Sequence, residues 1–236
     1  MEPQISDAFT LRVSEVFESL QGEGPHAGRA CVFLRLALCN LRCGWCDTKY
    51  TWDFKSHSYD QEVKEQPVAE LVEQLQALAP RHLVITGGEP LLQQAALQTL
   101  LTELDPKLFV EIETNGTLPP SAFLSARVQH WNVSPKLANS GESEARRLRF
   151  PALLEFSRLP GAWLKLVLSS PAEWSEAEAI VAQAGWPKER ISLMPKASNR
   201  AELEAASKGI AELAASQKVR FSTRLHLLLW DGARGT

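Results

Sequence analysis

The sequence has few cysteines, no long apolar run and no excess of basic residues. Among its 236 residues are four cysteines, two methionines and two tyrosines. No apolar stretch reaches the roughly 20 residues of a membrane-spanning helix, so the sequence predicts no membrane segment. The net charge is -3, which gives no overall basic footprint for nucleic acid or an anionic membrane surface. Without repeats or low-complexity tracts as well, the chain is expected to act on small molecules.

The few cysteines are clustered. The first residues, Met1-Glu2-Pro3-Gln4, lack the basic start of a secretory signal, which predicts a cytoplasmic protein. In that reducing compartment, clustered thiols serve as metal ligands or redox groups more often than as disulfides. Cys39, Cys43 and Cys46 lie within eight residues, and three thiols leave one over in any pairing scheme. A metal site is therefore the leading interpretation.

The rest of the chain alternates β-rich runs with amphipathic helical stretches. Its length and 44% hydrophobic content suit one α/β domain covering residues 1–236. Periodicity predicts helices after Pro67, over 91–104 and over 201–215. It predicts strands over 11–17, 31–36, 82–86, 108–112, 128–133, 163–168, 191–194 and 219–228. This order predicts parallel strands joined by crossover helices.

Polar or glycine-rich segments follow six of these strands. They are Cys39 to Cys46, Gly87-Gly88-Glu89-Pro90, Glu113-Thr114-Asn115-Gly116, Ser134-Pro135-Lys136, Ser169-Ser170 and Met194-Pro195-Lys196. In a parallel α/β barrel the C-terminal ends of the strands open on one face, where active sites form. The six segments are therefore expected to converge on one cavity.

The number of cysteines bears on the kind of metal site. A structural zinc site closes its shell with four protein ligands, whereas three thiolates leave one position open. A four-iron cluster on three cysteines likewise keeps one iron free for an external ligand. The fourth cysteine, Cys31, begins a strand whose far end carries the loop, roughly 20 Å away along extended chain. It is expected to be a small buried apolar residue, with structural zinc or a redox dithiol as the alternatives for the triplet.

The spacing Cys-x3-Cys-x2-Cys, with Trp45 just before the last cysteine, resembles the signature of the radical S-adenosylmethionine superfamily. The resemblance implies a [4Fe-4S] cluster whose open iron binds S-adenosylmethionine and whose reduced form generates a 5'-deoxyadenosyl radical. Gly87-Gly88-Glu89 is similar to the second motif of that superfamily, which receives the amino group of the cofactor. Glycines allow close approach of backbone, and a carboxylate suits an ammonium group.

Six further blocks narrow the resemblance: FESLQGEG at 17–24, FLRL at 33–36, CDTKYTW at 46–52, VITGGEP at 84–90, IETNGT at 112–117 and VSPK at 133–136. They resemble one family within this superfamily, 7-carboxy-7-deazaguanine synthase. The resemblance implies a partial, modified TIM-type (β/α)6-like barrel. It also implies the radical ring contraction of 6-carboxy-5,6,7,8-tetrahydropterin to 7-carboxy-7-deazaguanine with loss of ammonia, on the route to queuosine in tRNA.

The same resemblance assigns the site residues. Those implied for the pterin substrate are Leu20, Gln21, Gly22, Glu23, Arg35, Thr86 and His226. Those implied for S-adenosylmethionine are Trp45, Gly88, Glu89, Ser134, Pro135, Lys136 and Met194, with Glu113 and Asn115 as further candidates. Thr48 is the implied Mg2+ ligand, although on its own Asp47-Thr48 reads as a helix cap. A one-electron reductant such as flavodoxin or ferredoxin and a homodimer, through the apolar segment 225–230, are also implied.

Two positions depart from the family pattern. Met194-Pro195 stands where Gln-Pro is usual, so a side-chain amide contact to the cofactor is replaced, with Lys196 or Ser198 as candidates to compensate. The sequence also continues to Thr236, beyond the point where related enzymes place a terminal carboxylate near the pterin.

Two other functions share some features of this sequence. A glycyl-radical activating enzyme would share the cysteine motif and Gly87-Gly88-Glu89, and a non-enzymatic zinc-binding module would use the cysteines alone.

Overall fold

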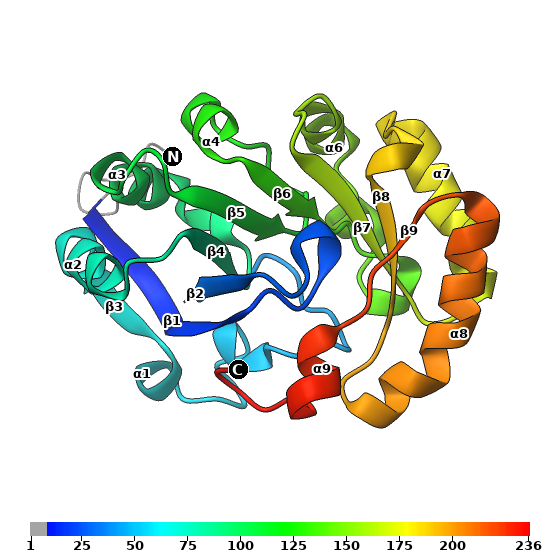
Figure 1. Cartoon of the computed structure of the whole chain (residues 1–236), viewed down its shortest axis with the longest axis horizontal. Helices are drawn as coiled ribbons and strands as arrows, with labels where there is room; N and C mark the ends of the chain where they lie inside the picture. The colour runs from blue at the N-terminus through cyan, green and yellow to red at the C-terminus, as the bar shows by residue number, and fades with distance from the viewer. Residues whose placement is uncertain (1–8) are drawn as a thin grey trace.

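One twisted sheet with helices on its outer side forms the body of the molecule in the computed structural model, which describes residues 9–236 (Figure 1). The acidic start of the sequence lies outside the described residues. The strands are β1 (Thr10–Leu20), β2 (Ala30–Leu36), β3 (Lys64–Pro67), β4 (His82–Gly87), β5 (Phe109–Thr114), β6 (His130–Val133), β7 (Ala162–Leu168), β8 (Ile191–Pro195) and β9 (Arg220–Phe221). The helices are α1 (Tyr59–Glu62), α2 (Val68–Leu78), α3 (Gln94–Glu103), α4 (Ala122–Arg127), α5 (Glu144–Arg147), α6 (Phe150–Ser157), α7 (Trp174–Ala184), α8 (Arg200–Gln217) and α9 (Leu225–Trp230).

The strand order is β3-β1-β2-β4-β5-β6-β7-β8-β9. From β2 to β9 every neighbouring pair is parallel, as the sequence predicted. The first strand is the exception, because β1 runs antiparallel to both β2 and β3. Only residues 21–29 separate β1 from β2, which is too short for the crossover that a parallel pair requires.

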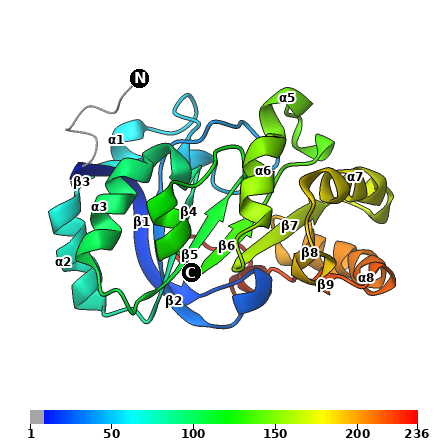
Figure 2. The same ribbon diagram turned by 90° about the horizontal axis from the view of Figure 1, so that it is seen from above.

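The barrel is partial, as expected. β3 and β9 end the sheet and do not pair with each other, so the barrel stays open on one side. Figure 1 shows α9 and the C-terminal segment on that side, close to β1, and Figure 2 shows α2, α3, α6, α7 and α8 around the outside of the strands. The Leu225 amide donates a 2.8 Å hydrogen bond to the Gly22 carbonyl, which joins the C-terminal segment to the residues after β1.

Alternation along the parallel strands separates two environments. Leu83, Ile85, Val110 and Ile112 are fully buried in the main apolar cluster with residues of α2 and α3. The residues between them on β4 and β5 include His82, Thr86, Glu111 and Glu113, and they face the inside of the barrel. Successive side chains of a strand point to opposite faces. On β4 and β5 the outward side chains are apolar and pack against helices, whereas the inward ones include polar groups that line the barrel interior.

The C-terminal segment corrects a predicted strand. Residues 219–228 were expected to be one strand, but β9 holds only Arg220–Phe221 and α9 begins at Leu225. An apolar run as short as Leu227-Leu228-Leu229 does not distinguish a strand from a helix. In the helix only Leu227 is buried, and Leu228 and Leu229 are exposed.

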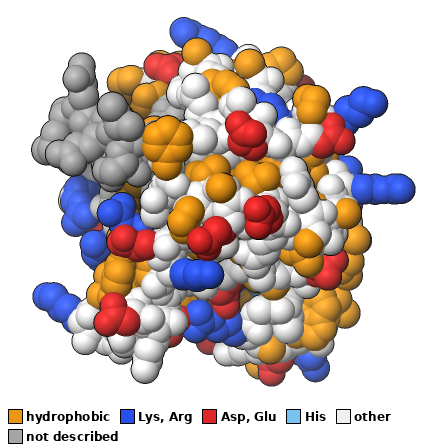
Figure 3. All heavy atoms as spheres, turned by 90° about the vertical axis from the view of Figure 1, so that its left-hand side faces the viewer, with side chains coloured by type: hydrophobic (Ala, Val, Ile, Leu, Met, Phe, Trp, Pro, Cys, Tyr) orange, Lys and Arg blue, Asp and Glu red, His pale blue; other side chains and the backbone are white. Residues whose placement is uncertain are grey.

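The outer surface carries charges of both signs. On the face shown in Figure 3, acidic and basic side chains are interspersed with apolar ones. Within residues 9–236, no helix has both the length and the apolar character needed to cross a membrane.

Candidate active site

A cavity of about 460 Å³ opens where the parallel strands end. Five of the six segments expected to converge line it, contributing among others Cys43, Gly88, Asn115, Lys136 and Met194. The sixth, Ser169-Ser170, does not, because the Ser169 amide turns to Glu173 at the start of the following helical turn. In its place β7 contributes the inward-facing Lys165 and Val167.

Most residues that the sequence assigned to the site line this cavity. They are Leu20, Gln21, Gly22, Glu23, Arg35, Cys39, Cys43, Trp45, Cys46, Thr48, Thr86, Gly88, Ser134, Lys136, Met194 and His226, together with Glu113, Asn115, Lys196 and Ser198. Two predicted cofactor residues, Glu89 and Pro135, are not in the lining. Cys31 is buried elsewhere, against Phe17, Phe33 and Val84, as expected for a small apolar residue.

The cysteine loop leaves β2 through a strained residue. Leu38 has φ 73°, in the left-handed region that side chains with a Cβ rarely adopt. Its amide donates to the Thr51 carbonyl at 2.7 Å, and its carbonyl accepts from the Glu89 amide at 2.8 Å. These two bonds hold the turn that directs the following residues, Cys39 onward, over the cavity.

The three sulfur atoms suit a cluster better than a single ion. One zinc ion with about 2.3 Å bonds would bring its thiolates to within about 3.8 Å of one another. Among the described residues the only trio with ligand atoms all within 4.8 Å is His26, His82 and Glu111, so at least one pair of the three sulfur atoms lies farther apart than that. Two N–H groups already point at sulfur, from Leu41 to Cys39 at 3.4 Å and from Trp52 to Cys46 at 3.3 Å. This donor set fits an iron-sulfur cluster, in which such bonds stabilise thiolate ligands.

Burial keeps two of these thiols protonated in the metal-free chain. It raises the pKa of Cys39 to about 12, and the nearby Glu89 carboxylate adds to that effect. Burial also raises the pKa of Cys43, although Lys136 partly opposes it. Iron binding therefore has to displace protons from this loop.

The double glycine after β4 is required by close backbone contacts. Gly87 has φ 128°, and a Cβ on it would lie 2.0 Å from the Leu36 carbonyl oxygen. A Cβ on Gly88 would lie 2.0 Å from the Leu38 oxygen. Both contacts are with the segment that leads into the cysteine loop, so only glycine lets the two loops meet.

Glu89 turns away from the cavity and ties β4 to β5. Its fully buried carboxylate accepts from the Leu91 amide at 3.0 Å, the Thr114 hydroxyl at 2.8 Å and the Asn115 amide at 2.7 Å. Burial raises its pKa, and these hydrogen bonds oppose the rise. Both oxygens of this carboxylate help to position the loops, and its contact with the amino group of the cofactor stays a prediction.

Arg35 reaches the cavity from the inside of β2. Its Nε donates to Glu15 Oε2 at 2.8 Å, and its two terminal nitrogens have no partner among the described residues. Although burial opposes the charge, Tyr50 and Glu15 raise the pKa of Arg35. One side of the guanidinium is thus held in a structural ion pair, while the other remains available to a carboxylate.

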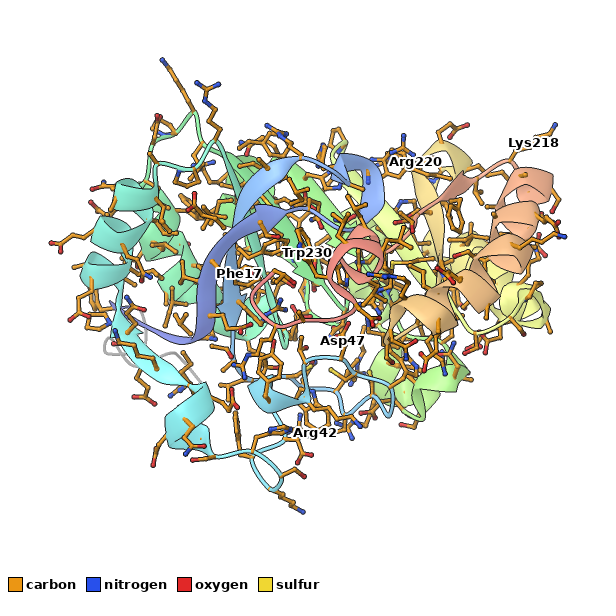
Figure 4. The ribbon with its side chains drawn as sticks, turned by 60° about the horizontal axis from the view of Figure 1, so that its bottom comes forward. Phe17, Arg42, Asp47, Lys218, Arg220 and Trp230 are labelled. Atoms are coloured by element: carbon orange, nitrogen blue, oxygen red, sulfur yellow. The ribbon has the colours of Figure 1, made fainter. Side chains whose placement is uncertain are left out.

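A network of charged side chains, buried except for Asp47, also lines the cavity. The Glu23 carboxylate accepts from Lys165 Nζ and, at 2.9 Å, from Arg224 Nε, and Arg224 also pairs with Asp47 beside the cysteine loop. Figure 4 shows Asp47 beside the C-terminal segment, whereas Arg42 lies at the outer end of the same loop. Burial alone would raise the pKa of Glu23, but Lys165 and Arg224 hold it well below its usual range. The network joins the β1–β2 hairpin, β7, the cysteine loop and the C-terminal segment.

Gln21 is fully engaged inside the protein. Its Nε2 donates to Glu111 at 2.5 Å and to Glu113 at 3.3 Å, and its Oε1 accepts from the Glu23 amide at 3.1 Å. The side-chain amide that the sequence assigned to the pterin therefore positions the hairpin. Thr86 is likewise engaged, donating to Glu113 at 2.8 Å.

The remaining predicted residues lie at the rim of the cavity. The Trp45 ring is held by a 3.0 Å hydrogen bond to Asn139, with Lys136 Nζ 5.5 Å from its centroid. Lys136 also reaches the Ser134 hydroxyl at 3.3 Å. His226 lies on α9 over Gly22, where a Cβ would meet its ring at 2.2 Å.

Comparison with known proteins decides the family. The Radical SAM superfamily matches residues 36–140. A 7-carboxy-7-deazaguanine synthase from Pyrobaculum aerophilum is 40% identical over 227 residues, covering 95% of this chain and 97% of that protein. One from Hyperthermus butylicus is 41% identical, covering 93% and 92%. The chain belongs to the 7-carboxy-7-deazaguanine synthase family.

Fold comparison agrees with this membership. A crystal structure of QueE from Escherichia coli has a TM-score of 0.69 at 24% identity, over 92% of this chain and 95% of that chain. Streptococcus suis SuiB bound to S-adenosylmethionine has a TM-score of 0.51 over 81% of this chain and 48% of that chain. Membership in the synthase family leaves the glycyl-radical activating enzyme and the zinc-binding module without support.

Sequence reasoning missed Lys165 and Arg224 and read Asp47 only as part of a helix cap. For Lys165 a signal was present, because a lysine within the apolar run AWLKLVL of a buried parallel strand must find a partner inside the barrel. Arg224 carried no such signal, since its segment was assigned to a strand. The ion pairs of Lys165 and Arg224 are identified from the distances between their charged atoms and not from membership in the family.

Proposed function

We infer that this chain catalyses the radical ring contraction of 6-carboxy-5,6,7,8-tetrahydropterin to 7-carboxy-7-deazaguanine with loss of ammonia. One observation carries the inference: a single cavity brings together a three-cysteine loop and buried groups of both charges suited to a polar heterocycle that bears a carboxylate. When bound, the [4Fe-4S] cluster and S-adenosylmethionine supply the carbon radical that removes a hydrogen atom from the substrate.

Cofactor binding is proposed to use the rim described above. Cys39, Cys43 and Cys46 hold the cluster. The face of Trp45, fixed by Asn139, packs against the adenine, and Lys136 and Ser134 contact ribose and carboxylate oxygens. The support for this arrangement is that the three cysteines, Trp45, Ser134 and Lys136 line the same cavity. Because Met194 replaces an amide there, that stretch of wall offers apolar contact and the backbone of β8.

Substrate binding is proposed to use Arg35 on β2, Lys165 on β7 and the residues around them. The free terminal nitrogens of Arg35 pair with the pterin carboxylate, since a guanidinium presents two parallel donors to such a group. Lys165 remains charged, because Glu23 and Glu113 raise its pKa despite burial. It orients the heterocycle without giving up its proton. Leu20, Gly22 and His226 form the surface beside the ring, and Thr86 is held in place by Glu113.

A magnesium ion is proposed at Thr48. Its hydroxyl lies 3.6 Å from Cys46 Sγ, and Thr48 lines the same cavity as Arg35, the proposed partner of the substrate carboxylate. Mg2+ takes oxygen ligands and retains several waters, so one protein hydroxyl with the substrate carboxylate can hold it.

Partners beyond the site are also proposed. An external one-electron donor such as flavodoxin or ferredoxin reduces the cluster. Two copies form a dimer through the exposed Leu228 and Leu229 of α9. Solution scattering at micromolar concentration is expected to give the mass of two chains, and a mass of one chain would contradict the dimer.

The decisive experiment is anaerobic reconstitution with iron and sulfide, reduction, and incubation with S-adenosylmethionine and 6-carboxy-5,6,7,8-tetrahydropterin. We expect 7-carboxy-7-deazaguanine by mass spectrometry from the parent chain and from Cys31→Ala, and none from Cys43→Ala. Accumulation of 5'-deoxyadenosine without this product would leave the radical chemistry and remove the substrate assignment.

A further inference from the structure

A second cluster of ligand-type side chains lies at the other end of the barrel. His82 is the first residue of β4, Glu111 lies in the middle of β5, and His26 comes from the hairpin between β1 and β2. None of the three lines the active-site cavity. The strands β4 and β5 run in parallel away from this cluster and toward the cysteine loop.

We propose that His26, His82 and Glu111 form a binding site for a divalent transition-metal ion of the zinc type. Glu111 Oε2 lies 2.9 Å from His26 Nδ1 and 3.0 Å from His82 Nε2, and all three atoms lie within 4.8 Å of one another. Four-coordinate zinc with bonds of about 2.0–2.2 Å places its ligand atoms about 3.3 Å apart. The two distances from Glu111 need to lengthen by only a few tenths of an ångström, and the two histidine nitrogens, within 4.8 Å of each other, need to settle at about 3.3 Å.

The charge balance favours a cation at this place. Glu111 is fully buried, and no lysine or arginine pairs with it among the described ion pairs. Its other oxygen, Oε1, accepts from Gln21 at 2.5 Å and from Asn132 at 2.6 Å. The histidines and amides satisfy the carboxylate by hydrogen bonding, but a buried carboxylate without a lysine or arginine partner is costly. A bound cation supplies that charge.

The chemistry of the ligands selects the class of ion. Two imidazoles and one carboxylate suit zinc and its neighbours rather than Mg2+ or Ca2+, which take oxygen. His82 and Glu111 are fully buried, whereas the His26 side chain is 24% exposed, so the fourth position faces the hairpin side and is open to water. The amides of Gln21 and Asn132 orient the carboxylate from behind.

One feature limits the affinity. His82 Nδ1 is buried and has no partner among the described residues, so this ring lacks the outer hydrogen bond that usually strengthens a zinc-bound histidine. The loss of such a bond weakens zinc affinity by about 10- to 100-fold. A bound ion would fix the hairpin of residues 21–29 to β4 and β5, and the same carboxylate already holds Gln21 at the active site.

The test uses the full chain with its iron-sulfur cluster reconstituted, equilibrated anaerobically with Zn2+ and then passed over a desalting column. Iron and zinc per chain are measured by elemental mass spectrometry, and zinc affinity by calorimetric titration. We expect one zinc per chain in the parent and in His57→Gln, a matched control for a histidine outside the cluster. His26→Gln, in a partly exposed hairpin, should weaken binding at least tenfold with unchanged iron content.

A second set of variants removes the cysteines from the measurement. In the chain with Cys39, Cys43 and Cys46 all changed to alanine, Co2+ should give the ligand-field bands of a four-coordinate site without thiolate charge transfer, and Glu111→Gln should abolish them. Zinc content equal in the parent and in His26→Gln would overturn the proposal. So would a parent that carries full iron and no zinc.

Discussion

Replacing Lys165 with methionine tests the buried charge network directly. Lys165 Nζ pairs with Glu23 and lies 4.0 Å from Glu113, and the residue is 5% exposed. Methionine preserves the length and apolar packing of the side chain but removes the charge. The Glu23 carboxylate then keeps only Arg224, at 2.9 Å.

The expected cost follows from that geometry. Breaking a buried ion pair by removing one partner costs roughly 3–5 kcal/mol, and a hydrogen bond to a charged group contributes about 1.5–3 kcal/mol. Because Arg224 remains as a partner, the loss for Lys165→Met should lie at the lower end, about 3 kcal/mol, which is about a 150-fold change in the unfolding equilibrium.

The assay is urea unfolding followed by the fluorescence of the seven tryptophans, on iron-free parent and variants compared under the same reducing conditions. The double variant Glu23→Gln/Lys165→Met should lose less than the sum of the two single variants by at least about 1 kcal/mol, because the groups interact directly. Additive losses, or a loss below about 1 kcal/mol for Lys165→Met, would refute the reasoning.

Three further predictions use other parts of the site. Gly87→Ala should lower the free energy of unfolding by more than about 2 kcal/mol, since its Cβ would meet a carbonyl oxygen. Gly141→Ala should lower it by only about 1 kcal/mol, and thermal unfolding compares the two variants. Gly141 is the matched control because it also has positive φ but nothing within 4 Å of the added Cβ. Glu23→Gln should flatten the acid limb of the pH–stability curve: the lowered pKa of Glu23 means that its contribution is complete above the usual glutamate value of 4.5 and declines as the pH falls below it. An unchanged acid limb would contradict this pairing. Arg35→Lys should raise KM for the pterin about tenfold or more, because a lysine cannot pair with Glu15 and a substrate carboxylate at once as a guanidinium can. Steady-state kinetics measure this KM and cofactor titration measures the affinity for S-adenosylmethionine, which should change little; a parallel loss of cofactor affinity would contradict the assignment of Arg35 to the substrate.

The sequence by itself determined the local chemistry of the active site. Cys39, Cys43 and Cys46 are adjacent along the chain, so their spacing alone predicts a shared ligand loop. Gly87 and Gly88 mark a close backbone approach wherever the loop lies. The parallel order of most strands, and hence the convergence of five segments at one end, follows from the alternation of strands and helices.

The tertiary structure decided what depends on groups far apart in sequence. Arg224 and Asp47 are 177 residues apart, and Lys165 and Glu23 are 142 apart, so only the tertiary fold brings each pair together. The same fold turns Glu89 toward Asn115 and away from the cavity, and it assembles His26, His82 and Glu111 at the other end of the barrel. Short apolar runs such as Leu227-Leu228-Leu229 are compatible with either period, and α9 forms because one face of that segment packs while the other stays exposed. The cysteine ligands can be read from the sequence because they are neighbours along the chain. The charged pairs inside the barrel cannot, because only the packing of distant segments decides which charges meet.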